Sequence, residues 1–535
     1  MLRGVCVEGG ADGEAGRAGP GLRCAFAMVI ALIFQLVPHQ VARAAGADGE
    51  LHVAVSTEAE AAQPPPEAGG WTSTAPKTRV RYALEGIDLR GNDRTSDRVV
   101  LRFIPYRSGD VLDVEDPELE VIRYRLLATG YFSSVVLSLR RGSKRGRAIL
   151  VVELVERNTI IVENLAMGIA ADEDQDGNSE PISPFLGLQM AETNLAGTGI
   201  TIGAGFAAAS DQFAINARFF DPAFLGSDWT VQANLIYADG RDFFGNRDVS
   251  FESPLLEQQK VTDYAVVDYK RFGGSVGVGY DLSLATRILV SYQLEGVDAV
   301  VPTVASHFRG DTREPIDFDI QPGVSVLSKL NASLVYDTRD APFLPRQGQL
   351  ASLRAGFAVA PIGSSYGYGK LELGYAHWWT LPWGHVVSLE GQMGAIAGDA
   401  PFFEKFYVGD YTDLLPDRIL GLNPDRRQPP NLLGTDIIEV RYGDYAAKLA
   451  GEYRIPLYAG RDSIYGIDFF TGAGLYGVAA RRDFRDPPSG YEGFARAPLD
   501  LTYNLGLRFE TYVGGFSVAF SNLFGLLPGR GGNRK

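Results

Sequence analysis

The chain has 535 residues, of which 45% are hydrophobic and 21% are charged. Enough apolar surface is therefore available to bury a core, which excludes a wholly disordered chain. The formal net charge of −15 argues against nucleic acid as a partner, since nucleic-acid binding needs a basic surface. The apolar run at residues 25–37 is too short to cross a bilayer as a helix, which excludes a polytopic helical membrane protein.

The apolar run lies within a predicted export signal. Arg23 precedes it, and Ala42-Arg43-Ala44 follows it as an A-x-A cleavage site, so we expect a signal peptide over residues 1–44. Both cysteines lie upstream of this site, which leaves no disulfide framework in the mature chain. Residues 45–78 are rich in Ala, Glu and Pro and show no periodicity, so we expect a disordered linker there.

Residues 79–157 show the pattern of a small α/β domain in the order β-α-α-β-β. The second helix is the best delimited element, because Asp116 can cap it and Pro117 suits its first position. Gly130 suits the position after its last turn. A strand and a short helix precede this helix, and two strands joined by a basic turn follow it.

The pattern changes to β-strands over residues 158–535. Apolar and polar residues alternate in many stretches, the clearest being 229–235, 448–455 and 501–510. A transmembrane barrel would turn the apolar face of each strand to lipid, whereas a sandwich would bury it. The length of the segment, the export signal and the alternation of short and long connections favour the barrel over a secreted protein of several sandwiches.

Three short motifs in the small domain carry a resemblance to a known module. They are Gly91-Asn92 after the first strand, Gly109-Asp110 between the helices, and Gly130-Tyr131-Phe132 at the exit of the second helix. With these motifs the domain resembles a POTRA domain, the periplasmic module of the BamA/TamA outer-membrane assembly superfamily.

The barrel segment is similar to the same superfamily at three further places. Residues 192–199 resemble its first periplasmic turn, residues 336–340 its mid-barrel hairpin, and residues 401–409 the opening of its long sixth extracellular loop. Each motif alone is weak, but the ordered set is specific. The resemblance implies a mostly β fold, with an antiparallel transmembrane barrel of about 16 strands preceded by one POTRA domain.

The chain departs from the family in the sixth loop. There the family usually carries V-R-G-F/Y, whose arginine pairs with acids on the lumen wall; here the segment reads Ile419-Leu420-Gly421-Leu422. Gly472 stands where the facing strand usually has an acid, so both partners are lost together, as expected when a lone buried charge is costly. Arg418 and Glu452 could form a shifted pair, and Gly421 and Arg454 are further lumen or loop candidates. The sequence leaves open whether the loop latches inside the barrel.

No cofactor, metal or catalytic residue is expected. Asp172, Asp174 and Asp176 match the opening of a calcium loop, but Ser183 replaces the glutamate at its twelfth position. We therefore expect an acidic surface loop, with a weak divalent-cation site as the alternative. The G-x-S-x-G match at residues 273–277 continues as a strand rather than forming a nucleophile elbow, and the histidines lack zinc or Ser-His spacing.

The resemblance implies a non-enzymatic protein of the cell outer membrane, with its POTRA domain in the periplasm. It would insert β-barrel proteins or export polypeptides. Unfolded or extended clients would add to the POTRA sheet edge and to a weak barrel seam between residues 159–170 and 516–520, because unpaired strand edges template further strands. Outer-membrane lipids are the other expected partner. The alternatives are a porin-like channel or transporter without lateral insertion, and an outer-membrane lipid-active enzyme, which the scattered histidines disfavour.

Overall fold

The computed structural model describes ten stretches of the chain, which are residues 81–113, 116–173, 179–252, 260–301, 306–309, 312–315, 317–424, 431–460, 463–485 and 490–520. The predicted signal peptide, residues 1–44, and the predicted linker, residues 45–78, lie outside them. Among the residues described, no helix is long and apolar enough to cross a membrane.

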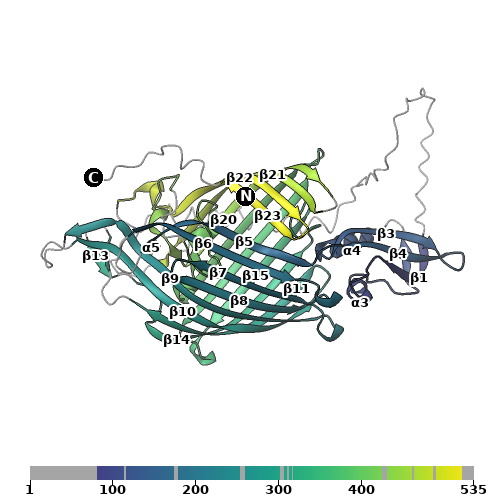
Figure 1. Ribbon diagram of the computed structural model, residues 1–535, viewed down its shortest axis with the longest axis horizontal. Coiled ribbons are helices and arrows are strands. Elements are labelled where there is room, and N and C mark those ends of the chain that lie inside the picture. Colours follow the sequence, from purple (N-terminus) through teal and green to yellow (C-terminus); the bar gives the residue numbers. More distant parts are fainter. Residues whose placement is uncertain are drawn as a thin grey trace, which may run out of the picture. The chain divides into compact units, whose positions relative to one another are not determined.

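The first domain is a four-stranded sheet with two helices (Figure 1). Its elements are β1 (Arg81–Arg90), α3 (Asp97–Leu101), β2 (Val111–Asp113), α4 (Pro117–Ala128), β3 (Phe132–Arg141) and β4 (Arg147–Glu156). The strands lie in the order β2-β1-β4-β3, and β1 runs parallel to β4. The predicted order lacked β2, because a strand of three residues carries no periodic signal.

Helix α4 begins and ends as its sequence predicts. The Asp116 carboxylate accepts a hydrogen bond from the Glu118 N–H at 3.0 Å, and Pro117 occupies the first helical position. Ile122 and Leu126 are fully buried in the core of the domain, and Gly130 takes a φ of +75° beyond the helix. The helix therefore owes its boundaries to local signals and its stability to one buried face.

The second part of the chain is one antiparallel sheet of fifteen strands within the described residues. The strands are β5 (Ile160–Glu173), β6 (Ser179–Glu192), β7 (Thr201–Ala209), β8 (Gln212–Asp221), β9 (Trp229–Glu252), β10 (Lys260–Asp281), β11 (Thr286–Val300), β14 (Gly323–Asp337), β15 (Gly348–Ala358), β16 (Gly367–Thr380), β17 (Val386–Asp399), β20 (Tyr445–Ala459), β21 (Ile464–Ala479), β22 (Leu499–Thr511) and β23 (Gly514–Phe520). Each pairs with its predecessor and its successor in this order, so the sheet is a meander that curls into a nearly closed barrel (Figure 1). The predicted barrel is confirmed.

Short elements fill the connections between the barrel strands. They are the strands β12 (Ser306–Arg309), β13 (Thr312–Pro315), β18 (Phe406–Tyr407) and β19 (Tyr442–Gly443), the helix α5 (Arg481–Arg485), and the 3₁₀ turns η1 (Leu195–Gly197), η2 (Phe224–Gly226), η3 (Ala360–Ile362), η4 (Phe402–Glu404), η5 (Val408–Tyr411), η6 (Asp436–Glu439) and η7 (Gly493–Arg496). Strands β18 and β19 pair with each other inside the connection between β17 and β20.

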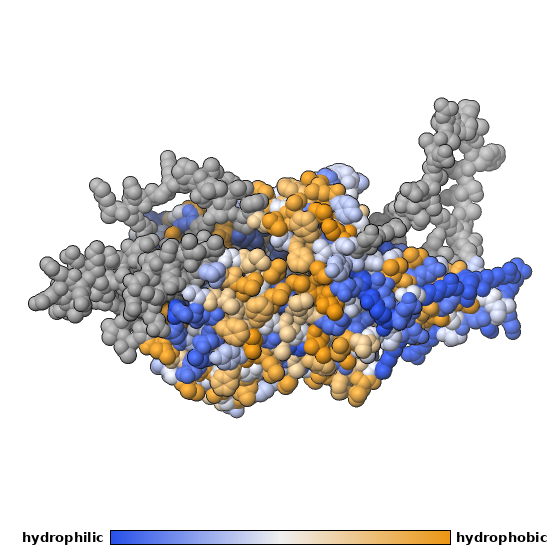
Figure 2. Space-filling view, viewed as in Figure 1, coloured by the Kyte–Doolittle hydropathy of each residue, from blue (hydrophilic) through white to orange (hydrophobic). Residues whose placement is uncertain are grey.

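The apolar face of the barrel strands is outside. In the predicted alternating stretch 229–235, Trp229 and Leu235 are 52% and 65% exposed, whereas Thr230 is fully buried. Figure 2 shows hydrophobic residues gathered over the outer face of the barrel strands. A sandwich would bury these side chains, so the outward apolar face identifies a membrane barrel.

Glu156, the last residue of β4, holds the loop that follows β1. Its carboxylate accepts hydrogen bonds from the backbone N–H groups of Arg94 (3.1 Å) and Thr95 (2.6 Å). Burial acts to raise the pKa of Glu156, but the hydrogen bonds from Thr95 and Arg94 outweigh it and hold this pKa below its usual range. The ionised carboxylate therefore stabilises this end of the domain.

We expect this stabilisation to disappear in acid. Because the pKa of Glu156 is lower in the folded state, its contribution is complete above the ordinary glutamate value of about 4.3 and is lost as the pH falls through the folded-state pKa. Hydrogen exchange of the Thr95 amide, corrected for its intrinsic rate, should lose protection over that range. Glu156→Gln should start with less protection at neutral pH and change little on acidification. Identical profiles for the two proteins would contradict this account.

Candidate functional site

The connection between β17 and β20 folds into the barrel in its described parts, residues 400–424 and 431–444, and we call these parts the lumen loop. Several of its side chains are buried in one cluster with residues of the barrel wall. Phe402 packs edge-on against Tyr269 of β10, with ring centroids 5.1 Å apart, and against Phe244 of β9 at 5.4 Å. The long sixth loop predicted from residues 401–409 is therefore a plug inside the lumen.

The base of the lumen loop is held by charges. Lys329 Nζ donates to Glu404 Oε2 at 2.7 Å, and both side chains are only 10% exposed. Lys370 Nζ donates to the Glu404 carbonyl at 3.0 Å. Arg271 of the wall lies over the ring of Phe403 at 4.2 Å and pairs with Glu295 at 2.7 Å. At Glu404 the wall thus supplies the cations and the loop the acid, whereas elsewhere Arg441 of the loop lies 3.5 Å from Asp242 of β9.

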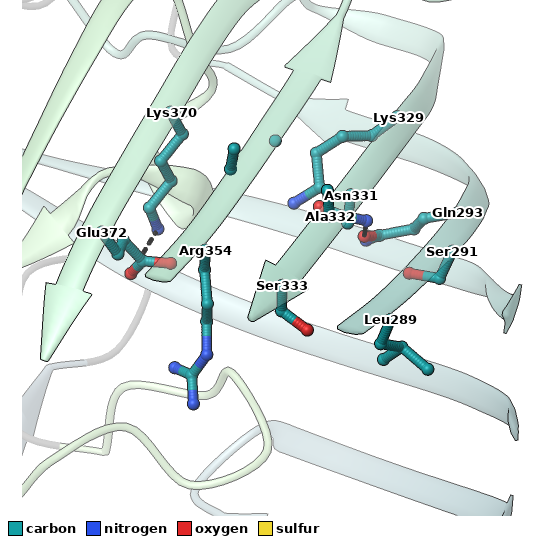
Figure 3. A pocket seen from close by; sticks show the side chains of 12 residues that line it. Leu289, Ser291, Gln293, Lys329, Asn331, Ala332, Ser333, Arg354, Lys370 and Glu372 are labelled. Atoms are coloured by element: carbon teal, nitrogen blue, oxygen red, sulfur yellow. Dashed lines mark hydrogen bonds and ion pairs between the residues drawn. The ribbon is translucent and has the colours of Figure 1, made fainter. Parts of the chain in front are cut away.

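A cavity of about 240 Å³ opens on the wall beside this anchor. Strands β11, β14, β15 and β16 line it, with Lys329, Arg354 and Lys370 as its cationic side chains (Figure 3). Lys370 also pairs with Glu372 at 3.4 Å. The lumen wall next to the loop therefore carries charged and polar side chains, as a barrel interior typically does.

The tip of the lumen loop is a two-residue hairpin. The backbones of Ile419 and Leu422 exchange two hydrogen bonds of 2.9 Å, and Leu420 and Gly421 between them have φ values of +51° and +83°. Both central residues are left-handed, as a type I′ turn requires, and leucine is an unfavourable residue there. Ile419 and Leu422 are 5% and 2% exposed, so the turn directs two apolar side chains into a buried site.

The tip docks on a row of small residues that runs across four strands. Gly187, Ala207, Ala214 and Ala238 are direct partners from β6 to β9, and Ile419 and Leu422 pack against the three alanines. A Cβ on Gly187 would come within 2.3 Å of the Ile419 side chain. The row is small because larger residues would occupy the place of the tip.

Polar contacts complete the docking of the tip. Tyr269 Oη donates to the Gly421 carbonyl at 3.2 Å, and Gln212 Nε2 donates to the Asn423 carbonyl at 3.1 Å. The loop therefore latches inside the barrel, which answers the question that the sequence left open. It does so with apolar side chains and backbone acceptors at the tip.

The shifted ion pair predicted between Arg418 and Glu452 is wrong. Arg418 lies within the loop, where its Nε is 3.1 Å from Asp410 Oδ2 and its Nη1 donates to the Phe403 carbonyl at 3.0 Å. Glu452 instead receives two hydrogen bonds from Arg508 of β22, at 2.8 and 2.6 Å. Sequence spacing indicates neither contact. The partner of Arg418 lies inside the loop, and the partner of Glu452 lies two strands away.

Arg454, the other predicted lumen residue, is 1% exposed near the connection between β14 and β15. It donates to the Pro345 carbonyl and lies 3.7 Å from Asp468. Its Nε also lies 3.7 Å from Glu452 Oε1, so these two predicted residues of β20 form a pair. Arg418 and Gly421 lie instead in the lumen loop, Gly421 at its tip.

The glycines of the POTRA motif serve backbone turns. Gly91, Gly109 and Gly130 all have positive φ values, between +75° and +100°. At Gly91 a Cβ would lie 2.0 Å from the Leu154 carbonyl oxygen, so no other residue fits. These positions shape the domain and need no further role.

The remaining motif residues make contacts inside the domain and with the first barrel turn. Asn92 Nδ2 donates to the Thr95 carbonyl at 3.0 Å, and the Asp110 carbonyl accepts from the Leu84 N–H at 2.8 Å. Phe132 is buried in the core, whereas Tyr131 Oη donates to the Gly199 carbonyl at 3.3 Å. Tyr131 is thus the motif residue that reaches the barrel.

The proposed divalent-cation loop is only partly described. Asp172 lies in β5, in a part whose side chains are not described, and Asp174 and Asp176 lie outside the described residues. Within the described part of the chain, no group of three or more His, Cys, Asp or Glu side chains is placed to hold a metal ion.

The barrel seam lies between β5 and β23, the two edges of the fifteen-stranded sheet. In the described part of these strands no β-ladder joins them; one backbone hydrogen bond runs from the Val162 N–H to the Val513 carbonyl at 2.6 Å. At Gly514 a Cβ would lie 2.4 Å from the Val162 carbonyl oxygen, so the close approach needs glycine. Strand β5 has fourteen residues and β23 seven, so most of the β5 edge has no described strand beside it.

Two family descriptions match the chain. The Omp85 superfamily domain matches residues 194–520, and the POTRA family, described as surface antigen variable number repeat, matches residues 82–157.

Among curated proteins, the outer membrane protein assembly factor BamA of Nitratidesulfovibrio vulgaris is 23% identical, over 67% of this chain and 41% of that protein. BamA of Neorickettsia risticii is 24% identical, over 53% of this chain and 33% of its own. The chain thus spans less than half the length of these relatives. Among solved structures, CdiB from Escherichia coli gives a TM-score of 0.50 at 12% identity, covering 82% of this chain and 72% of that one. This likeness concerns the fold.

Filling the small-residue row should expel the loop tip. Gly187→Val places a side chain where Ile419 lies, so the loop should undock and trypsin should cut after Arg418 on the order of tenfold faster, equivalent to about 1.4 kcal/mol. Gly391→Ala is the matched control, because its nearest neighbour would lie 3.9 Å away. Equal cleavage rates in both variants and the parent would contradict the docking.

Removing the acid at the base should destabilise the barrel. Glu404→Gln leaves Lys329 buried without its counter-charge, which typically costs about 3–5 kcal/mol. The temperature at which the folded band is lost in heat-modifiability electrophoresis should fall. Glu372→Gln should leave it nearly unchanged, because Glu372 is more exposed and its pair is longer.

Proposed function

We propose that this chain, which belongs to the Omp85 superfamily, inserts β-barrel proteins into the outer membrane or exports polypeptides across it. Its barrel lies in the outer membrane and its POTRA domain in the periplasm. The resemblance drawn from the sequence motifs is thereby confirmed. The activity and its clients are inferences from this membership and from the seam.

The seam is the observation that carries the proposal. Along most of β5 no strand is described on the side away from β6, and lipid cannot satisfy N–H and C=O groups that are left unpaired at the depth of a membrane. An incoming β-strand can satisfy them by pairing with β5. Leu165 and Met167 of β5 are exposed on the outside, so a strand that paired here would emerge beside lipid. The outer-membrane lipids that surround the apolar outer face are the second partner.

The POTRA sheet offers a second edge for extended polypeptide. Strand β3 is an outer strand of the sheet, and Val136 at its middle is 49% exposed. The other outer strand, β2, has three residues and is too short to hold a long partner. We therefore assign β3 as the edge that receives clients by β-augmentation.

The family is one of outer-membrane assembly and transport, and we propose that this chain acts without catalysing a reaction. Ser275, the serine of the G-x-S-x-G match, is paired on both sides within β10, opposite Gln293 and Asn234. A nucleophile elbow needs a sharp turn from strand to helix, which this position does not have. Binding and strand templating need no such group.

The lumen loop argues against a porin-like channel. A porin needs an open aqueous lumen, but Phe402, Tyr407 and Val408 of the loop are at most 1% exposed, in a cluster with the wall. Passage through the lumen would require the loop to leave. Passage along the seam leaves the loop in place.

Site-specific photocrosslinking tests the proposal. A photoreactive residue at Met167 on β5 should capture outer-membrane or secreted polypeptides in cells. The same residue at Leu235 on β9, which is equally exposed on the outside of the barrel, should contact lipid alone. Depletion of the protein should lower the level of the captured polypeptides. Equal capture at both positions, or unchanged levels after depletion, would refute the assignment.

A further inference from the structure

We propose that Arg157 is a positioning residue that fastens the POTRA domain to the periplasmic end of the barrel seam. These contacts hold the periplasmic end of the seam closed. The proposal rests on the seam being the working site of the proposed function. It is carried by the contacts of one short segment, residues 157–162, which joins β4 of the POTRA domain to β5 of the barrel.

The backbone of Arg157 belongs to the POTRA domain. Its N–H donates to the Tyr131 carbonyl at 2.9 Å, and its own carbonyl accepts from Arg94 Nη2 at 3.0 Å. The neighbouring Glu156 binds the backbone of Arg94 and Thr95. The main chain at this point is therefore fixed on both sides by the domain that it ends.

The side chain of Arg157 makes its contacts with the barrel. Its Nη1 lies 3.0 Å from Glu510 Oε1 and its Nη2 donates to the Thr511 carbonyl at 3.2 Å. The guanidinium also lies over the rings of Tyr465, at 4.4 Å, and Phe343, at 5.8 Å. It is only 5% exposed, so the ion pair is shielded from water and its loss would leave a buried carboxylate unpaired.

The polar partners of Arg157 in the barrel lie at the start of the hairpin that joins β22 to β23. Glu510 and Thr511 close β22, and β23 begins at Gly514. The next residues of the segment follow the same hairpin, because Asn158 Nδ2 donates to the Tyr512 carbonyl at 3.0 Å and the Val162 N–H donates to the Val513 carbonyl at 2.6 Å. Along the described part of the seam, these contacts gather at one end.

This arrangement fastens one end of the seam. The periplasmic end carries an ion pair and three hydrogen bonds, whereas no ladder joins β5 to β23 within the described residues. Separation of β5 from β23 at the periplasmic end would therefore have to break these contacts. A displacement of the POTRA domain by a bound client would be carried through the Arg157 backbone to the Glu510 hairpin.

A second POTRA arginine provides the matched control. Arg102 of the loop after α3 forms an ion pair with Asp281 at the end of β10, and both side chains are largely buried. Strand β10 lies in the middle of the sheet order, far from either edge strand. Loss of this pair removes a POTRA-to-barrel contact of the same chemistry without touching the seam.

The experiment measures the seam in the full chain in lipid nanodiscs, without a client. Nitroxide labels are placed at Met167 on β5 and Val518 on β23, which are 66% and 59% exposed, with Cys6 and Cys24 replaced by serine. Pulsed electron paramagnetic resonance should give a longer and broader distance in Arg157→Gln and in Glu510→Gln, by about one strand spacing, roughly 5 Å. Arg102→Gln should match the parent. The charge exchange Arg157→Glu with Glu510→Arg should restore the parent distribution.

Unchanged distances in both Arg157→Gln and Glu510→Gln would overturn the proposal. Equal widening in Arg102→Gln would also overturn it, since any POTRA contact would then suffice. Heat-modifiability electrophoresis checks that each barrel is folded. If Arg157→Gln does not fold, Glu510→Gln decides, because it removes the same pair from the barrel side. A widened seam together with no client capture at Met167 would refute the proposed function and leave the fastening role of Arg157 supported.

Discussion

The pairing of backbone groups in lipid is the constraint on which the rest of this structure depends. Inside a bilayer every N–H and C=O must find a partner within the protein, so a sheet survives there only if it closes. Fourteen ladders join the fifteen strands in order. Within the described residues no ladder joins the first strand, β5, to the last, β23. The outward apolar side chains, the filled lumen and the fastening at Arg157 are the described features that hold such a barrel together.

Charges of both signs on the lumen loop meet charges on the wall. Glu404 of the loop pairs with Lys329 of the wall, and Arg441 of the loop lies 3.5 Å from Asp242 of β9. The tip carries no charge at all. Burial of Ile419 and Leu422 is worth about 1.5–3 kcal/mol each in water-to-apolar transfer, without the desolvation penalty of a buried ion pair.

The sequence predicts the barrel and the POTRA domain because their signals are local. Alternation over residues 229–235 and the cap at Asp116 need only neighbouring positions. The docking site of the loop tip could not be predicted in this way. The row from Gly187 to Ala238 exists only because strand register places four separate residues side by side. Small inward residues on consecutive strands were a signal in the sequence, but register cannot be read from one strand at a time. The partner of Arg418 could not be predicted for the same reason, because it depends on the path of the folded loop.

The two anchors of the lumen loop also set how the plug responds to temperature. Apolar contacts weaken as water cools. The desolvation penalty of a buried ion pair grows on cooling, because the hydration of charged groups becomes more favourable. Cold water would therefore weaken both the contact of Ile419 and Leu422 with the alanine row and the pair of Lys329 with Glu404, so neither anchor compensates for the other.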